Sequence, residues 1–193
     1  MSGDVGERAR RPRSRRSDAQ RNIDAILDAA ARLLDERPRA SMQEIARAAG
    51  VHRATVHRHF ASRDDLLVAL RDRSLDAFVE LATDDELLAG EPAGALRRFT
   101  QAVLEGGDRD RGWRVLPVYD GAAQEREDAY LERLLGLMAR GQGAGKLRAD
   151  LGPEHLLMAW GGLVVAALPR IAQGRMDPTQ ATDFVLRLLA PAA

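Results

Sequence analysis

Apolar residues in the first part of the chain recur every three or four positions, which is the spacing of one face of an α-helix. Ser17 and Gln20 have the spacing of a capping box just before this stripe, and Pro38 is placed to end the helix. The pattern predicts a helix over residues 18–36. Its apolar stripe consists of Ile23, Ile26, Leu27, Ala30 and Leu34.

Two much shorter helices are expected next. Ser41 and Glu44 repeat the capping pattern and predict a short helix that ends at Gly50, because glycine readily takes the left-handed conformation of a sharp reversal. Residues 52–58 have room for barely two further turns before a third capping pattern, Ser62 with Asp65, starts a longer helix. Two short helices across a glycine turn describe a helix-turn-helix, whose second helix enters the DNA major groove.

The charge distribution favours an anionic partner for this end of the chain. Residues 1–73 contain 16 arginines and 11 acidic residues, about +5, and the other 13 basic and 18 acidic residues leave about −5 in the rest. A solvated arginine-rich surface would give the same counts. Residues 1–16 are expected to form a disordered basic arm, which either enters a minor groove or only raises non-specific affinity.

The stretch SMQEIARAAGVHRATVHRHFASRDDLLVAL resembles the DNA-binding domain of TetR-family (tetracycline-repressor-like) transcriptional regulators. The likeness extends over about residues 18–70. It implies an all-α protein of about nine helices, with a three-helix helix-turn-helix domain over residues 17–62 and a helical ligand-binding and dimerisation domain over residues 63–193. The positions that carry the likeness are Ile45, Ala46, Ala49, Gly50, Val51, Thr55, His59, Phe60 and Leu66.

The resemblance also implies which residues contact DNA. Arg53, with His52 and Ala54, is expected to lie toward base edges, where an arginine binds guanine bidentately. Thr55, His57 and Arg58 are expected to hold phosphates together with the Ser41 amide. The full predicted set is Ser41, Gln43, His52, Arg53, Ala54, Thr55, His57, Arg58, His59 and Arg63.

Several of these positions depart from the family pattern. His57 replaces the usual tyrosine, and an imidazole can still donate to a phosphate but titrates near neutral pH, so DNA affinity is expected to depend on pH. His52 stands where a serine or threonine commonly caps the recognition helix, Ala54 replaces a frequent glycine, and Arg63 replaces a frequent lysine. His59 has a second interpretation, in which it only packs at the helix end beside Phe60.

Metal binding and catalysis fit this stretch poorly. His52, His57 and His59 are spaced by five and two residues, whereas a metal site on a helix needs two ligands three or four residues apart. A short exposed helix also lacks the cleft that general-base catalysis requires. No metal and no cofactor are expected.

The rest of the chain is predicted to be helical as well. Pro92 is placed at a helix start, and an apolar stripe that includes Tyr130 and Met138 follows. Residues 153–171 and 178–189 are expected to form the last two helices, which in the family build a four-helix dimer interface; completion of a monomeric core is the alternative. The predicted interface residues are Leu156, Trp160, Leu163, Val164, Ala167, Phe184, Val185 and Leu188.

In proteins of this family the middle helices enclose an inducer pocket. The large side chains available here are also ordinary core residues, and we expect only two or three of them to touch a ligand. The candidates are Phe78, Phe99, Trp113, Tyr119, Tyr130, Met138 and Trp160.

Composition narrows the cellular setting. The chain has no cysteine, its first residues lack the apolar core of a secretory signal, and the apolar run WGGLVVAALP is too short to span a bilayer. We therefore expect a cytoplasmic protein with no membrane partner. The predicted function is a homodimeric repressor that binds a palindromic operator as double-stranded DNA and is released by a small-molecule inducer. Two alternatives stay open: a constitutive or protein-partnered regulator, and an enzyme with an unrecognised site among Arg114, Asp120 and Glu125.

Overall fold

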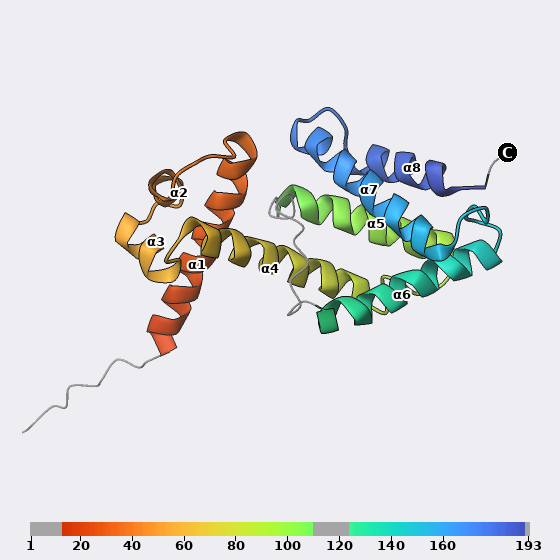
Figure 1. Ribbon diagram of the computed structural model, residues 1–193, viewed down its shortest axis with the longest axis horizontal. Helices are drawn as coiled ribbons and strands as arrows, with labels where there is room; N and C mark the ends of the chain where they lie inside the picture. Colours follow the sequence, from red (N-terminus) through yellow and green to blue (C-terminus); the bar gives the residue numbers. More distant parts are fainter. Residues whose placement is uncertain (1–12, 110–123, 192–193) are drawn as a thin grey trace, which may run out of the picture. The chain divides into compact units, whose positions relative to one another are not determined.

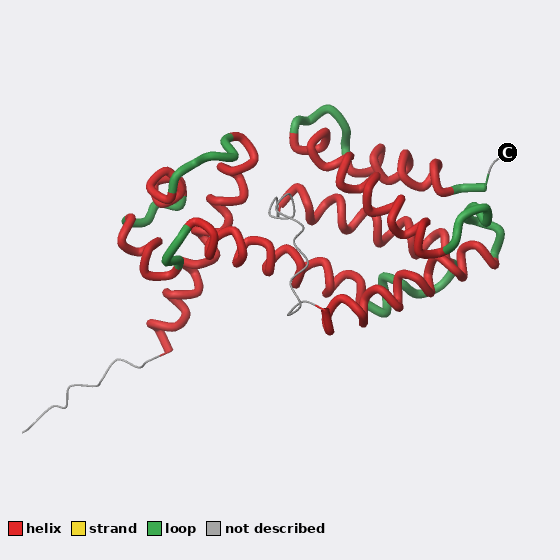
Figure 2. Tube along the Cα trace, in the orientation of Figure 1, coloured by secondary structure: helices red, strands yellow, loops and turns green. Residues whose placement is uncertain are grey.

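The computed structural model describes residues 13–109 and 124–191, and its regular elements are all α-helices (Figures 1 and 2). The all-helical prediction is confirmed, with eight helices in the described residues against about nine expected. The chain divides into two compact units, Met1–Leu66 and Leu67–Ala193. Each unit has its own core.

The first unit contains α1 (Arg13–Glu36), α2 (Met42–Ala48), α3 (Arg53–His59) and the first turn of α4 (Arg63–Thr83). α2 packs against both α1 and α3. The core is built from small and aliphatic side chains of these four helices and of the loop after α1, with one phenylalanine after α3. Its buried residues include Ile26, Leu27, Ala30, Ala40, Ile45, Ala46, Val56, Phe60 and Leu66.

The first helix begins earlier than the sequence indicated. α1 starts at Arg13 and not after a cap at Ser17, so residues 13–16, expected in the disordered arm, are helical. Arginine is a good helix former, and a helix that is already under way passes through a serine without ending. The capping spacing of Ser17 and Gln20 therefore does not mark a helix start.

The other two capping patterns of the first unit are confirmed. The Ser41 hydroxyl oxygen accepts from the Glu44 N–H at 3.3 Å, and the Ser41 N–H donates to Glu44 Oε2 at 2.8 Å. Ser62 and Asp65 exchange the same two bonds, at 3.1 and 2.8 Å, at the start of α4. Each pair satisfies backbone N–H groups that have no partner within the helix.

The second unit contains the rest of α4 with α5 (Pro92–Arg109), α6 (Gln124–Gly143), α7 (Pro153–Ala172) and α8 (Pro178–Leu189). α7 contacts α5, α6 and α8, and α5 contacts α6 and α8, so α5 and α7 form the middle of the bundle (Figure 1). The largest fully buried side chains here are Phe99, Leu70, Leu96, Leu104, Leu134, Leu137, Met138, Leu156 and Leu189.

The connection from α6 to α7 is held by specific contacts. Gly141 is buried, and a Cβ atom at this position would lie 2.6 Å from Leu147 Cδ1, so only glycine lets Leu147 fold back onto the helix. The Gln142 side-chain amide donates to the carbonyls of Arg148 and Leu151, at 2.8 and 2.7 Å. These contacts fix the point at which α7 begins.

The helix α7 is long and apolar enough, by length and composition, to cross a membrane. From the sequence no membrane span is expected, because the uninterrupted apolar run is short. The helix that contains this run has 20 residues and is longer than the run. A core helix of a soluble protein meets the same two criteria. α7 buries six side chains against its own unit, Leu156, Trp160, Val164, Ala167, Leu168 and Ile171.

Candidate nucleic-acid interface

The turn between α2 and α3 has the geometry that the sequence predicted. Gly50 has φ +66°, the left-handed conformation that favours glycine. The Val51 N–H donates to the Ala46 carbonyl at 3.0 Å, which closes the end of α2. Ile45 on α2 and Val56 on α3 are both fully buried, so each anchors its short helix in the core of the first unit. The pair forms a helix-turn-helix.

The outward face of α3 is polar and carries no acidic residue. His52, Arg53, Ala54, His57 and Arg58 are exposed, and Thr55 is half-buried. A seven-residue helix with one buried anchor and a basic exposed face matches a recognition helix. The structure thus brings seven of the ten predicted DNA contacts together at α3 and its cap, while their roles on DNA stay predictions.

His52 has a structural role besides its predicted one. It is the N-cap of α3, and its Nδ1 accepts from the Ala54 N–H at 3.2 Å. An imidazole nitrogen accepts a hydrogen bond only when it carries no proton. His52 therefore takes the place of the serine or threonine cap in the family pattern.

Arg53 and His57 contact each other along α3. The Arg53 Nε–H donates to His57 Nε2 at 3.3 Å. The predicted base-reading residue is therefore bonded to the predicted phosphate-binding residue, an arrangement that the sequence reasoning missed. The available signal was the spacing of four residues, which makes two side chains neighbours on a helix surface.

The start of α2 is less free to bind a phosphate than predicted. The Ser41 amide already donates to the Glu44 carboxylate, so a phosphate would have to displace that carboxylate. This backbone bond, with the bond from the Ser41 hydroxyl and the charges of Arg37 and Arg47, holds the pKa of Glu44 below its ordinary value. In this structure the Ser41 amide is one of the donors in the capping box of α2.

Two other predicted contacts lie nearby on different elements, and His59 ends α3. Gln43 is exposed on α2. Arg63 is half-buried, and its Nη2 donates to the Pro38 carbonyl at 2.7 Å, which ties the start of α4 to the loop after α1. His59 is half-buried against Phe60, with ring centroids 6.4 Å apart, and its Nε2 is buried with no hydrogen-bond partner among the described residues. This contact favours packing over DNA contact for His59.

No three histidine, aspartate or glutamate side chains in the described residues come together as a metal site requires. Of the residues named for an enzyme site, Arg114 and Asp120 lie outside the described part of the chain. Glu125 falls in α6.

The second unit brings four of the predicted pocket residues into one aromatic cluster. Phe99 and Trp160 are stacked with ring centroids 5.2 Å apart, and both are buried. Phe78 lies edge-on to Phe99 at 5.7 Å and to Tyr130 at 5.3 Å. Met138 is buried in the same core. Trp113 and Tyr119 lie outside the described residues.

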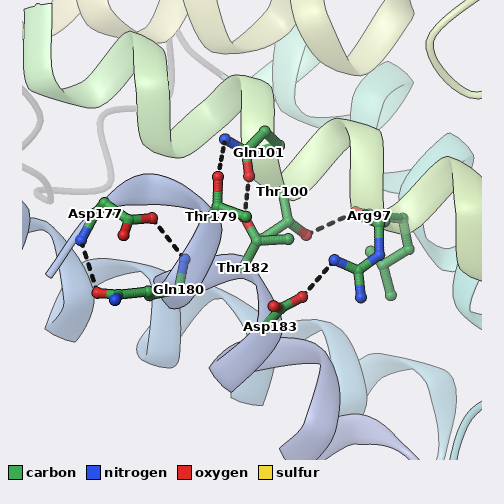
Figure 3. A network of polar contacts seen from close by, with 9 residues as sticks. Arg97, Thr100, Gln101, Asp177, Thr179, Gln180, Thr182 and Asp183 are labelled. Atoms are coloured by element: carbon green, nitrogen blue, oxygen red, sulfur yellow. Dashed lines mark hydrogen bonds and ion pairs between the residues drawn. The ribbon is translucent and has the colours of Figure 1, made fainter.

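A polar seam was not predicted, and Figure 3 shows its contacts between α5 and α8. The Trp160 indole N–H donates to the Thr100 hydroxyl at 2.9 Å, and that hydroxyl donates to the Leu96 carbonyl at 2.7 Å. One residue on, the Gln101 side-chain oxygen accepts from the Thr182 hydroxyl at 2.8 Å. A threonine at a core-facing position of a predicted helix is the available sequence signal, since a buried hydroxyl needs a hydrogen-bond partner. The seam connects α5 to α7 and α8.

Five of the predicted interface residues belong to the core of the chain itself. Their side chains are at most 4% exposed, so a second copy would not reach them. They are Leu156, Trp160, Val164, Ala167 and Val185. Leu163 is half-buried, whereas Phe184 and Leu188 are 48% and 45% exposed. Met158 and Val165, at 71% and 56%, are exposed apolar residues of α7 that the sequence reasoning missed.

Known proteins resemble the chain in both sequence and fold. A family model described as bacterial regulatory proteins, tetR family, matches residues 26–70, which contain α2, α3 and their turn. The HTH-type transcriptional regulator NfxB of Pseudomonas aeruginosa is 32% identical over 133 residues, covering 65% of this chain and 70% of NfxB. The chain belongs to the TetR family of bacterial regulatory proteins.

A second relative of this TetR-family regulator is known in both sequence and structure. The HTH-type transcriptional repressor LfrR of Mycolicibacterium smegmatis is 40% identical over 100 residues, covering 52% of this chain and about half (50%) of LfrR. The crystal structure of LfrR from Mycobacterium smegmatis in complex with proflavine matches with a TM-score of 0.65 and 28% identity, over 86% of this chain and 93% of that one. The TetR-family chain is therefore a DNA-binding transcriptional regulator.

Proposed function

We propose that the chain is a homodimeric repressor that binds a palindromic operator through α3 and leaves it when a small molecule binds the second unit. The observation that carries this proposal is the exposed face of α3, which is basic and free of acidic residues. Caps at both ends and one buried side chain hold the helix itself in place. On this proposal residues 17–62 form the DNA-binding domain and residues 63–193 the ligand-binding and dimerisation domain.

Dimerisation is supported by exposed apolar side chains on α7 and α8. Exposed apolar side chains do not stabilise a monomer, whereas a two-fold contact between two copies would remove them from water. A two-fold dimer presents two copies of α3 to half-sites about one helical turn of DNA apart, which is why we propose a palindromic operator. The interface residues we propose are Met158, Leu163, Val165, Phe184 and Leu188.

A planar aromatic molecule is the inducer class that we propose. Phe99 and Trp160 stack on each other in the core, and Phe78 and Tyr130, which are only partly buried beside them, would give a further aromatic ring an aromatic environment. The relative LfrR, named a transcriptional repressor, has been crystallised with proflavine, which is such a molecule.

Selection of bound sequences from a random duplex library, at two salt concentrations, tests the DNA-binding part. We expect a palindromic motif that survives the higher salt. Binding without a motif that collapses as salt rises would mean that the arginines give only electrostatic affinity, and the proposal would fail.

Addition of proflavine to the complex with the selected duplex tests release. A repressor of the proposed kind should leave the duplex as proflavine saturates it, and proflavine should raise the melting temperature of the free protein. Unchanged binding and melting would sink the choice of an aromatic inducer. If a broad screen finds no stabilising small molecule, a constitutive or protein-partnered regulator becomes the better account.

We also propose a cytoplasmic location and no enzymatic activity. The relatives are named as transcriptional regulators, which supports this assignment. Turnover of any substrate class by the purified protein would contradict it.

A further inference from the structure

The bond between Arg53 and His57 links two residues whose predicted roles differ. Both side chains are exposed on α3, one helical turn apart, and the Arg53 Nε–H donates to His57 Nε2 at 3.3 Å. The bond joins the side chain expected to read a base to the one expected to hold a phosphate. Because the bond holds the guanidinium of Arg53, it bears on base recognition more directly than on phosphate binding.

The hydrogen-bond chemistry of the two groups determines which nitrogen atoms take part in this bond and which do not. His57 Nε2 can accept this bond only in the tautomer that carries the imidazole proton on Nδ1. A guanidinium has five N–H donors, and the one on Nε is used here. The four donors on the terminal nitrogens Nη1 and Nη2 are not used by this bond. A guanine accepts two parallel bonds, at O6 and N7, from such a pair of nitrogens.

We propose that His57 is a positioning residue for base recognition, which holds the guanidinium of Arg53 by its inner nitrogen so that the two outer nitrogens face a guanine. This inference rests on the proposed function, in which α3 lies in the major groove. A long side chain that is ordered only on binding weakens a complex about two- to tenfold. His57 removes part of that cost before the DNA arrives.

A direct phosphate contact by His57 makes a different prediction. Phosphate contacts hold the protein on any sequence, so their loss weakens binding about equally on all duplexes. Loss of a positioning residue weakens binding chiefly where Arg53 meets its guanine. The ratio of two dissociation constants therefore separates the two roles.

The experiment uses the full chain and the operator that the wild-type protein selects. The position whose preference disappears in Arg53→Ala identifies the base pair read by Arg53. Dissociation constants are then measured for the operator and for its single-base variant at that position. The variants are Arg53→Ala, His57→Gln, His57→Leu and the double variant Arg53→Ala with His57→Leu. Glutamine and leucine are close in size and both favour helices, but only glutamine can accept from Arg53.

We expect the wild type to prefer the guanine about five- to hundredfold, and Arg53→Ala to abolish this preference. His57→Leu should lower the preference about two- to tenfold, His57→Gln should retain it, and the double variant should match Arg53→Ala. Circular dichroism checks that each variant is folded, and His57→Ala replaces the leucine variant if that one is not.

Three results would overturn the inference while leaving the proposed function intact. In the first, His57→Leu weakens binding equally on both duplexes, as loss of a phosphate contact would. In the second, His57→Gln loses as much preference as His57→Leu. In the third, Arg53→Ala leaves every base preference unchanged. If the wild type selects no motif at all, the proposed function fails first, before any variant is compared.

Discussion

Helices α3 and α7 are built in opposite ways. α3 has seven residues and one buried side chain, Val56, and it exposes polar and basic groups. α7 has 20 residues and six buried side chains, and it exposes apolar ones. A helix as short as α3 is unstable alone, so its caps and its single anchor fix its position and leave most of its other side chains exposed. α7 is fixed by packing and leaves apolar side chains exposed, which the dimer that we propose would cover.

Removal of a large core side chain from the second unit should have the largest effect on stability. Phe99 is fully buried and touches both Trp160 and Phe78, so Phe99→Ala should lower the free energy of unfolding by about 3–5 kcal/mol. Chemical denaturation monitored by circular dichroism measures this. Leu151→Ala, at a 36% exposed position, is the control and should cost far less. Similar losses in both would contradict a core centred on the aromatic cluster.

A charge in the exposed apolar surface should separate the proposed dimer. Phe184→Glu places a carboxylate in the interface that we propose, and burial of an unpaired charge should weaken association by about 2 kcal/mol or more. Sedimentation velocity over a range of concentrations gives the dissociation constant. Ala139→Glu adds the same charge at an exposed position of α6 and should leave the dimer intact. A wild type that is monomeric at all concentrations would rule the interface out.

The cap of α2 should matter less, by about 1 kcal/mol. Ser41→Ala removes the oxygen that accepts from the Glu44 N–H, and loss of an N-cap has an effect of this size. Denaturation of Ser41→Ala and of Gln43→Ala, an exposed neighbour, measures the difference. Equal stability of the two variants would mean that packing, not capping, holds α2.

The smallest expected effect is the contribution of the Glu44 carboxylate to the dependence of stability on pH. The Ser41 amide lowers the pKa of Glu44, so the stabilisation is present above the ordinary glutamate pKa and is lost as pH falls through the lowered value. Thermal melting between about pH 6 and pH 3 should therefore show a steeper loss in the wild type than in Glu44→Gln. Parallel curves would mean that the bond adds no ionisation-dependent stability.

Local signals in the sequence predicted the first unit well. Capping at Ser41 and Ser62 and the left-handed turn at Gly50 depend on residues close together in the chain, and each is confirmed. The early start of α1 was missed because a capping spacing is not by itself a boundary. The capping role of His52 was missed because histidine is not among the residues preferred at an N-cap.

The second unit depends on contacts that the sequence does not specify. α7 is apolar nearly all round, so its period alone cannot tell the face toward its own core from the face toward a partner. Val164 and Val165 are adjacent and alike, yet one is 2% and the other 56% exposed. The bond between Trp160 and Thr100 joins residues 60 positions apart and is not visible from either segment.

The mass of the complex on the selected duplex, measured by light scattering, tests most directly the central claim that the first unit reads DNA and the second pairs two copies. The account predicts two chains on a palindromic duplex, and weak binding of Phe184→Glu to the same duplex. One tightly bound wild-type chain per palindromic duplex, or equally tight binding of Phe184→Glu, would contradict it.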